Sequence, residues 1–230
     1  MTVIQIYQGH ISSISVICGK VLLSTVTIAL MERIVLPAAW IIAVVYSSIP
    51  LFWFAIHPLA ARWRQMRRSP YRILLPLWTA LIAALLAITW PWRRAQLYSN
   101  LWAWLAATLF FSMGVRTYIR IRSEFGVTNF IGEAELRPQE NKPALVTTGL
   151  HSRMRHPIYV AHLCTFTGWA VGSGLLINFV LLGISLLITF PLMIRMEENE
   201  LVQRFGEAYR QYQRKVPLIP LFSKRAGETA

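Results

Sequence analysis

Residues 157–196, PIYVAHLCTFTGWAVGSGLLINFVLLGISLLITFPLMIRM, decide the fold of this chain. The stretch holds two apolar runs, each close to the ~20 residues that cross a bilayer as a helix, and Gly172-Ser173-Gly174 separates them. We therefore expect two membrane helices joined in a tight hairpin. Arg155-His156 precedes the hairpin and Glu197-Glu198 follows it. Because a hairpin returns to the side on which it began, these two charged groups are expected to meet at one membrane face.

The composition of the whole chain is that of an integral membrane protein. Of the 230 residues, 55% are hydrophobic and only 14% are charged, whereas a soluble domain carries roughly 25% charged residues. We predict an all-α fold, a polytopic membrane helix bundle of about six spans with a C-terminal helical hairpin and a cytoplasmic amphipathic tail helix. Lys20 lies near the middle of the first span, and the sequence does not define its role. The expected spans are Ile11–Met31, Leu36–Ile56, Ile73–Trp90, Leu97–Val115, Pro157–Leu175 and Leu176–Met196.

The basic residues predict the orientation of the bundle. Of the 23 Lys and Arg, 19 lie after the second span, between the fourth and fifth spans, or after the sixth. With six spans these regions share one side, and an excess of Lys and Arg marks that side as cytoplasmic. Arg93 and Arg94, in a short outer loop, are exceptions. Topology therefore accounts for the net charge of +13, and we predict no nucleic-acid partner.

Several chemistries are excluded by the residue types present. All ten acidic residues are Glu, so the chain has neither an Asp-based calcium loop nor a Ser-His-Asp triad. His151, His156 and His162 lack the i,i+4 spacing of paired helical metal ligands, and we predict no metal site. Cys18 and Cys164 lie in apolar segments and form no CxxC pair, so they are expected to pack as small hydrophobic side chains.

The chain divides into two regions of different character. Residues 1–115 hold the N-terminal membrane helices, and residues 116–230 hold a long loop, the hairpin and a tail. Glu200 and Arg204 are expected to form an i,i+4 surface pair where the tail helix begins. The tail carries one apolar stripe at steps of four and three, made of Leu201, Phe205, Tyr209, Tyr212 and Val216.

The charged groups at the open end of the hairpin are the candidate site. Pro157 has the position of a first helical residue, so Arg155 and His156 lie at the positive end of a membrane helix, where an anion binds well. The alternative for Arg155 is a topology anchor, which does not require the Pro and Tyr of Arg155-His156-Pro157-Ile158-Tyr159. Glu197 and Glu198 repel each other and require donors or a cation. They either form a solvated helix segment or recognise hydroxyls, an amine or a cationic cofactor centre.

The ordered motifs of residues 145–221 are similar to those of a known family. The segment resembles the C-terminal half of isoprenylcysteine carboxyl methyltransferases and of the related phospholipid N-methyltransferases. The match covers about a third of the chain by length, and the first four spans carry no comparable signature. The matching residues are Val146-Thr147-Thr148-Gly149, Arg155-His156-Pro157-Ile158-Tyr159, the hairpin, Glu197-Glu198, Leu201, Phe205-Gly206, Tyr209, Tyr212, Val216-Pro217 and Pro220.

The resemblance implies S-adenosylmethionine as methyl donor, held at the cytoplasmic face without a Rossmann domain. Glu197, Glu198 and Arg195 are then the candidate catalytic residues. Two positions depart from the family pattern, because Ala161 stands where Gly is frequent and His151 where Tyr is common. The candidate cofactor-binding residues are Gly149, Arg155, His156, Pro157, Tyr159, Glu198, Tyr209, Tyr212 and Arg214.

The function that follows is methyl transfer to a lipophilic acceptor at the cytoplasmic membrane face, most similar to isoprenylcysteine carboxyl O-methyltransferase. The sequence leaves open whether the acceptor is a prenylated cysteine, a phospholipid amine, or a small hydrophobic thiol or acid. Membrane lipids are the other expected partners. Sterol reductases, which use NADPH, share the FG…Y…Y…VP…P tail and are the competing enzyme class. A non-catalytic protein of this fold is a further alternative.

Overall fold

The computed structural model describes residues 31–125, 136 and 144–219, and the predicted span Ile11–Met31, with Lys20 and Cys18, lies almost entirely outside them. The chain is helical through most of this part. Short π-helical and 3-10 segments join the helices: η1 (Met31–Val35), η2 (His57–Leu59), η3 (Trp90–Trp92), η4 (Gly149–Ser152) and η5 (Ser185–Thr189). The α-helices are α2 (Leu36–Ile56), α3 (Ala60–Arg64), α4 (Tyr71–Thr89), α5 (Leu101–Phe125), α8 (Pro157–Ser173), α9 (Leu176–Ile184), α10 (Phe190–Phe205) and α11 (Glu207–Lys215).

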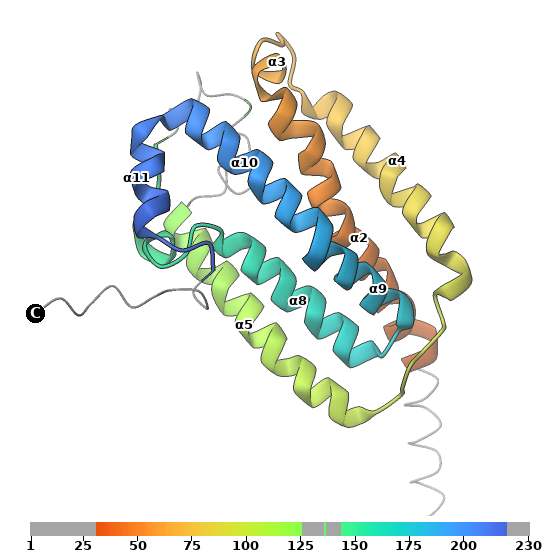
Figure 1. Cartoon of the computed structure of the whole chain (residues 1–230). Helices are drawn as coiled ribbons and strands as arrows, with labels where there is room; N and C mark the ends of the chain where they lie inside the picture. Colours follow the sequence, from red (N-terminus) through yellow and green to blue (C-terminus); the bar gives the residue numbers. More distant parts are fainter. Residues whose placement is uncertain (1–30, 126–135, 137–143, 220–230) are drawn as a thin grey trace, which may run out of the picture.

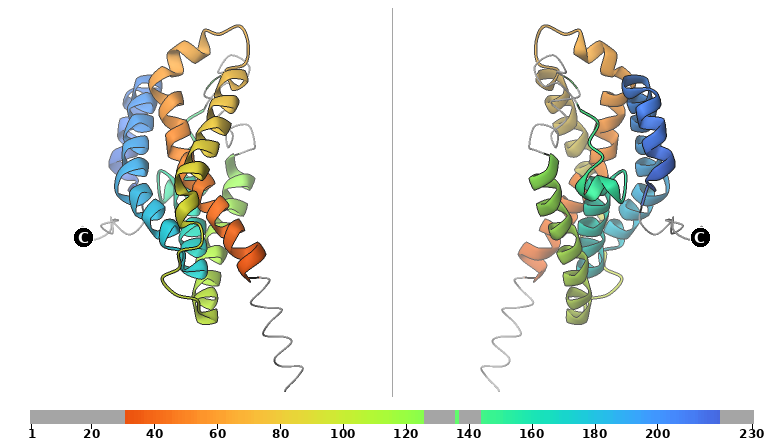
Figure 2. Two further views of the ribbon diagram at one scale, coloured as in Figure 1. Left: turned by 90° about the vertical axis from the view of Figure 1, so that its right-hand side faces the viewer. Right: turned by 90° about the vertical axis from the view of Figure 1, so that its left-hand side faces the viewer.

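The long helices form a bundle whose members run alternately up and down (Figure 1). α2 and α4 are joined through α3, and α5 runs beside α8. The segment α9–η5–α10 returns along α2 to the end at which α8 begins. The two turned views show α11 folded against this same end of the bundle (Figure 2). The predicted all-α membrane helix bundle is therefore confirmed, and the chain is an integral membrane protein.

Within the described residues, three helical segments are long and apolar enough to cross a membrane: Arg33–Arg64, Tyr71–Trp92 and Leu176–Phe205. The predicted span Leu36–Ile56 has the bounds of α2. α5 continues to Phe125, so it crosses the expected boundary between the regions at residue 115. Its extension carries Arg116, Arg120 and Arg122, three of the basic residues that were expected in a loop. The number of spans, six, and the two-region division stay predictions.

The hairpin bends where the sequence predicts it. Gly174 ends α8 with φ +64°, a left-handed conformation that favours glycine. The loop between α4 and α5 fastens this turn: the Leu97 amide donates to the Gly174 carbonyl at 2.8 Å, and the Leu176 amide donates to the Ala95 carbonyl at 2.8 Å. The turn therefore satisfies its polar groups with backbone atoms of a neighbouring loop.

α2 packs against α4, α8, α9 and α10. Its buried face joins residues of α8 and α9 in the largest apolar cluster, which includes Trp40, Phe166 and Leu181. Two indole N–H groups hold α4 to it: Trp40 donates to the Thr89 hydroxyl at 2.9 Å, and Trp78 donates to the Ser48 hydroxyl at 2.9 Å. The C-terminal end of α2 packs beside α10, where the candidate site lies.

Candidate active site

Arg155 joins three elements at the open end of the hairpin. Its Nε donates to Glu198 Oε1 of α10 at 2.7 Å. Its Nη1 donates to the carbonyl oxygens of Gln213 and Val216 at 3.1 and 2.8 Å. Carbonyls at a helix C-terminus lack partners within their helix and attract cations, so the guanidinium binds the end of α11. The predicted meeting of Arg155 with the Glu197-Glu198 pair is therefore present in the structure.

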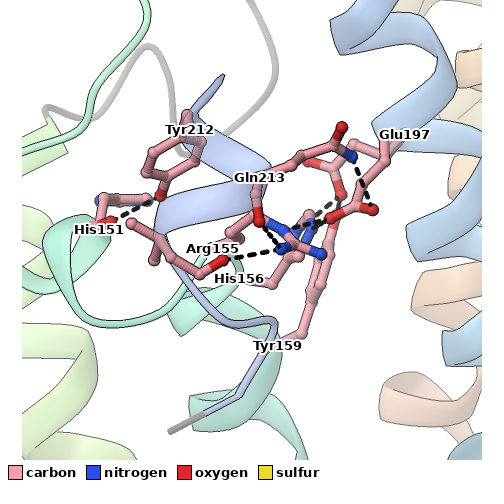
Figure 3. A network of polar contacts seen from close by, with 9 residues as sticks. His151, Arg155, His156, Tyr159, Glu197, Tyr212 and Gln213 are labelled. Carbon is pink, nitrogen blue, oxygen red and sulfur yellow. Dashed lines mark hydrogen bonds and ion pairs between the residues drawn. The ribbon is translucent and has the colours of Figure 1, made fainter. Parts of the chain in front are cut away.

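His156 and Tyr159 hold the two carboxylates from the first turn of α8 (Figure 3). The His156 ring lies between them, with Nε2 3.1 Å from Glu198 Oε1 and Nδ1 3.3 Å from Glu197 Oε2. The Tyr159 hydroxyl donates to Glu197 Oε2 at 2.7 Å. A spacing of three residues puts both rings on one helix face, where they stack with centroids 5.4 Å apart. Pro157, as the first helical residue, lets the chain turn into α8 at this point.

The charges of the carboxylates keep His156 protonated. Burial by itself would lower the pKa of His156, but the charges of Glu197 and Glu198 and hydrogen bonds to both raise it to about 9. The imidazole is therefore a cation at neutral pH. Two cations, Arg155 and His156, face two carboxylates in a largely buried cluster, which suits a site for a charged ligand with groups of both signs.

The tail closes over this cluster. Gly206, with φ +59°, breaks the expected single tail helix into α10 and α11, and α11 folds back against the start of α8. Gln213 Nε2 donates to Glu198 Oε2 at 3.1 Å. The Tyr212 hydroxyl donates to the His151 carbonyl at 2.6 Å, and burial raises the pKa of Tyr212 to about 12, so it stays a donor. Tyr209, 2% exposed, packs beside it.

Three predicted site residues are exposed and take no part in the hydrogen-bonded cluster. Gly149 is exposed and begins η4 with φ +60°. Arg195 is exposed on α10. Arg214 has 70% of its side chain exposed and pairs with Glu207 at 3.2 Å. Their functional roles stay predictions. Of the two departures from the family pattern, Ala161 is fully buried, and His151 contributes its backbone carbonyl to the tail contact described above.

The expectation that Glu200 lies on the surface is wrong. Glu200 is 7% exposed, and its carboxylate forms an ion pair with Arg64 of α3. The pairing rule for residues i and i+4 considers one helix only, whereas α10 packs against the corner formed by α2 and η2. This contact turns Glu200 inward.

Two residues near the cluster were not predicted, Gln213 and His57. Gln213 lies in a tail whose rotation the apolar stripe leaves undefined. His57 follows α2, is 5% exposed, and stacks on Trp53 with ring centroids 5.1 Å apart. The sequence could have identified His57, because it is a lone histidine directly after a predicted span. Pro58 follows it, as Pro157 follows His156.

Comparison with known proteins finds similarity to membrane methyltransferases. Residues 102–208 match the family model of phospholipid methyltransferase. Protein-S-isoprenylcysteine O-methyltransferase of Schizosaccharomyces pombe is 44% identical over 82 residues, which are 34% of this chain and 33% of that protein. These matches fit the predicted family of membrane methyltransferases. The matched model includes Arg155, Glu197 and Glu198, and ends just before Tyr209.

Other relatives match a longer part of the chain. Methanethiol S-methyltransferase of Pseudomonas deceptionensis is 28% identical over 211 residues, 83% of this chain and 78% of that protein. The protein of the same name from Crocosphaera subtropica is 27% identical over 177 residues, 71% of this chain and 64% of its own length. The chain thus matches about a third of the yeast relative and most of the P. deceptionensis relative. No solved structure matches the chain significantly.

Proposed function

We propose that the protein transfers a methyl group from S-adenosylmethionine to a lipophilic acceptor at the cytoplasmic face of the membrane. The observation that carries the proposal is the buried cluster of Arg155, His156, Glu197 and Glu198, closed by α11, at one end of the membrane helices. The cytoplasmic orientation rests on the distribution of Lys and Arg. The family match supports methyl transfer as the reaction class.

The residues of the cluster fit the charges of such a donor. It supplies an electrophilic methyl group on a sulfonium cation, and it also carries a carboxylate, an ammonium and ribose hydroxyls. Arg155 and the positive end of α8 can bind the carboxylate. Glu197 and Glu198 can accept from the ammonium or hydroxyls and stabilise the positive charge. Without the ligand these groups bind each other, so the charged pairs would exchange partners when it enters.

The apolar residues beneath the cluster suit a lipophilic acceptor. Tyr159, Phe190 and Met193 form a buried group, and Trp53 and Phe54 of α2 pack against it. Methyl transfer requires the nucleophile in line with the methyl group, and an apolar wall can orient the acceptor from the membrane side while the donor enters from water. The short match to the yeast relative favours the carboxylate of a prenylated cysteine, whereas the longer matches favour a hydrophobic thiol.

Binding of S-adenosylhomocysteine, the product formed from the methyl donor, distinguishes this function from that of an NADPH-dependent reductase. The purified chain in lipid nanodiscs is titrated calorimetrically with S-adenosylhomocysteine and with NADPH. We expect a dissociation constant in the range of roughly 1 μM–1 mM, typical of enzyme ligands, for S-adenosylhomocysteine and no heat from NADPH. The reverse preference would sink the methyltransferase proposal. Labelled S-adenosylmethionine with a panel of prenylcysteine, thiol and aminophospholipid acceptors then defines the acceptor.

A further inference from the structure

His57 is a buried histidine that the structure leaves without a hydrogen-bond partner. Its side chain is 5% exposed, and neither Nδ1 nor Nε2 bonds to any polar group of the described residues. A neutral imidazole carries one donor and one acceptor, and burying both unpaired is unfavourable. Stacking on Trp53 fixes the ring without satisfying either nitrogen. Such a group requires an explanation, and a bound ligand supplies one.

The charged groups that act electrostatically on His57 come from three neighbouring elements. They are Glu197 and Glu200 of α10, His156 at the start of α8, and Arg64 of α3. Glu197 binds His156 and Tyr159, and Glu200 pairs with Arg64. His57 is therefore the one histidine of this corner whose ring is unbonded to the described residues.

We propose that His57 is the acceptor-side base: it binds the heteroatom that receives the methyl group, takes its proton, and so defines the acceptor as a hydrophobic thiol. The inference rests on the proposed methyl transfer and deepens it. The family model begins at residue 102, so His57 lies in the part of the chain that the model does not match.

The charge around His57 favours a thiol over the other acceptor classes. A carboxylate is already ionised and needs no base, so an unbonded histidine would have no proton to take from it. A thiol enters neutral, and only its thiolate is a good nucleophile, so it requires a base close to its sulfur. Burial opposes a charge on His57, but the charge of Glu197, which outweighs that of His156 at this ring, favours the imidazolium that forms when His57 takes the proton. Glu200 is paired with Arg64, whose positive charge offsets it. Phe190, Met193 and Trp53 provide the apolar surroundings that a small thiol needs.

The step balances with the groups named. The thiol S–H bond breaks and its proton passes to a ring nitrogen of His57. The acceptor sulfur forms a bond to the methyl carbon, and the bond from this carbon to the sulfonium sulfur of S-adenosylmethionine breaks, with its electron pair remaining on that sulfur. The products are a thioether, S-adenosylhomocysteine and one proton, which His57 releases to water.

The kinetic test uses the full chain in nanodiscs with S-adenosylmethionine and an alkanethiol. We expect His57→Asn and His57→Phe to lower kcat/KM for the thiol by about 100-fold, the lower end of the range for general-base catalysis. Affinity for S-adenosylhomocysteine, measured by calorimetry, should stay within about twofold, which shows that the variants fold. The deficit should shrink as pH rises toward the pKa of the alkanethiol, because a thiolate needs no base. A structural role would give the same deficit at every pH.

His162→Gln is the matched control. His162 is a half-buried histidine whose Nδ1 lies 2.9 Å from the Tyr118 hydroxyl and 2.9 Å from the Ile158 carbonyl. We expect this variant to change kcat/KM by no more than a few-fold and to keep the pH profile of the unsubstituted protein. An independent measurement uses ¹⁵N-labelled histidine: the alkanethiol should shift the ring signals of His57 and leave those of His162 in place.

The outcomes separate this inference from the proposed function. If S-adenosylhomocysteine fails to bind the unsubstituted protein, the proposed function fails and the inference with it. If it binds and the thiol is methylated, but the His57 variants keep full activity or lose it equally at all pH values, only the role of His57 is overturned. Methylation of a prenylcysteine carboxylate or an aminophospholipid, with none of the thiol, overturns the acceptor class.

Discussion

The two ends of the α8–α10 hairpin are built by opposite means. At the bend, backbone amides and carbonyls of residues 95–97 and 174–176 bond to one another, and no charged side chain takes part among the residues described there. At the open end, Arg155, His156, Glu197 and Glu198 bond through their side chains. The bend therefore depends on conformation and packing, and the open end depends on charge. Substitutions at the first should change stability, and substitutions at the second should change ligand binding and rate.

The largest effect is expected at the bend. Gly174→Ala puts a Cβ 2.2 Å from the Tyr98 carbonyl oxygen at a residue with φ +64°. The left-handed conformation costs roughly 1–2 kcal/mol and overpacking roughly 1–3 kcal/mol more, so we expect a large fall in melting temperature in nanodiscs. Gly183→Ala is the control, because nothing lies within 4 Å of its added Cβ, and Ala is favoured over Gly in a helix. Equal melting temperatures for both variants would contradict this account of the bend.

The second effect is a pH dependence of stability at the open end. The pKa of His156 is raised from 6.5 to about 9 in the folded protein. The stabilisation is therefore complete below pH 6.5 and is lost as pH rises toward 9, by at most about 1.4 kcal/mol for each pH unit. We expect the melting temperature to fall across this window. His156→Gln should flatten the profile, and an unchanged slope in that variant would show that another group titrates.

These two ends also differ in how far the sequence predicts them. The bounds of α2 and the bend at Gly174 follow from local signals, because apolar length and a glycine act within one segment. The meeting of Arg155 with Glu198 was also predictable, since a hairpin brings its two ends together. The positions of His57 and Arg64 were not, because they depend on how α2 and α3 are rotated against α10. The prediction that Glu200 lies on the surface was wrong for this reason. The tail, which the apolar stripe predicted as one helix, is divided at Gly206.

The third effect concerns ligand binding at the open end. Arg155→Ala removes a charged donor from a cluster proposed to bind the donor carboxylate, and we expect S-adenosylhomocysteine to bind more weakly by roughly 1.5–3 kcal/mol. Calorimetry measures the change. Arg68→Ala, an exposed residue in the loop before α4, should alter binding little. If both variants lose affinity equally, Arg155 acts as a general positive charge and not as a ligand contact.

The smallest effect distinguishes carboxylates on one helix. Glu198 accepts from Arg155, His156 and Gln213, so Glu198→Gln changes the charge at the centre of the cluster. We expect the rate of methyl transfer to fall at least tenfold, about 1.4 kcal/mol of transition-state stabilisation. Glu197→Gln should lower the rate less. Glu207→Gln, 54% exposed on α11, should stay within about 0.5 kcal/mol of the unsubstituted protein.

Glu200→Gln makes the distinction sharp, because Glu200 is buried two residues beyond Glu198 and pairs with Arg64 instead of with the cluster. Losing its charge leaves Arg64 without its carboxylate, which should lower the melting temperature while the rate per folded molecule stays close to normal. The rate and melting temperature of each variant therefore have to be measured together. Glu200→Gln could instead slow methyl transfer most, with Glu197→Gln and Glu198→Gln near normal. The reacting face of α10 would then be the face toward the corner of α2 and α3, and not the face toward α8. That result would also strengthen the role of His57, on whose ring the charge of Glu200 acts.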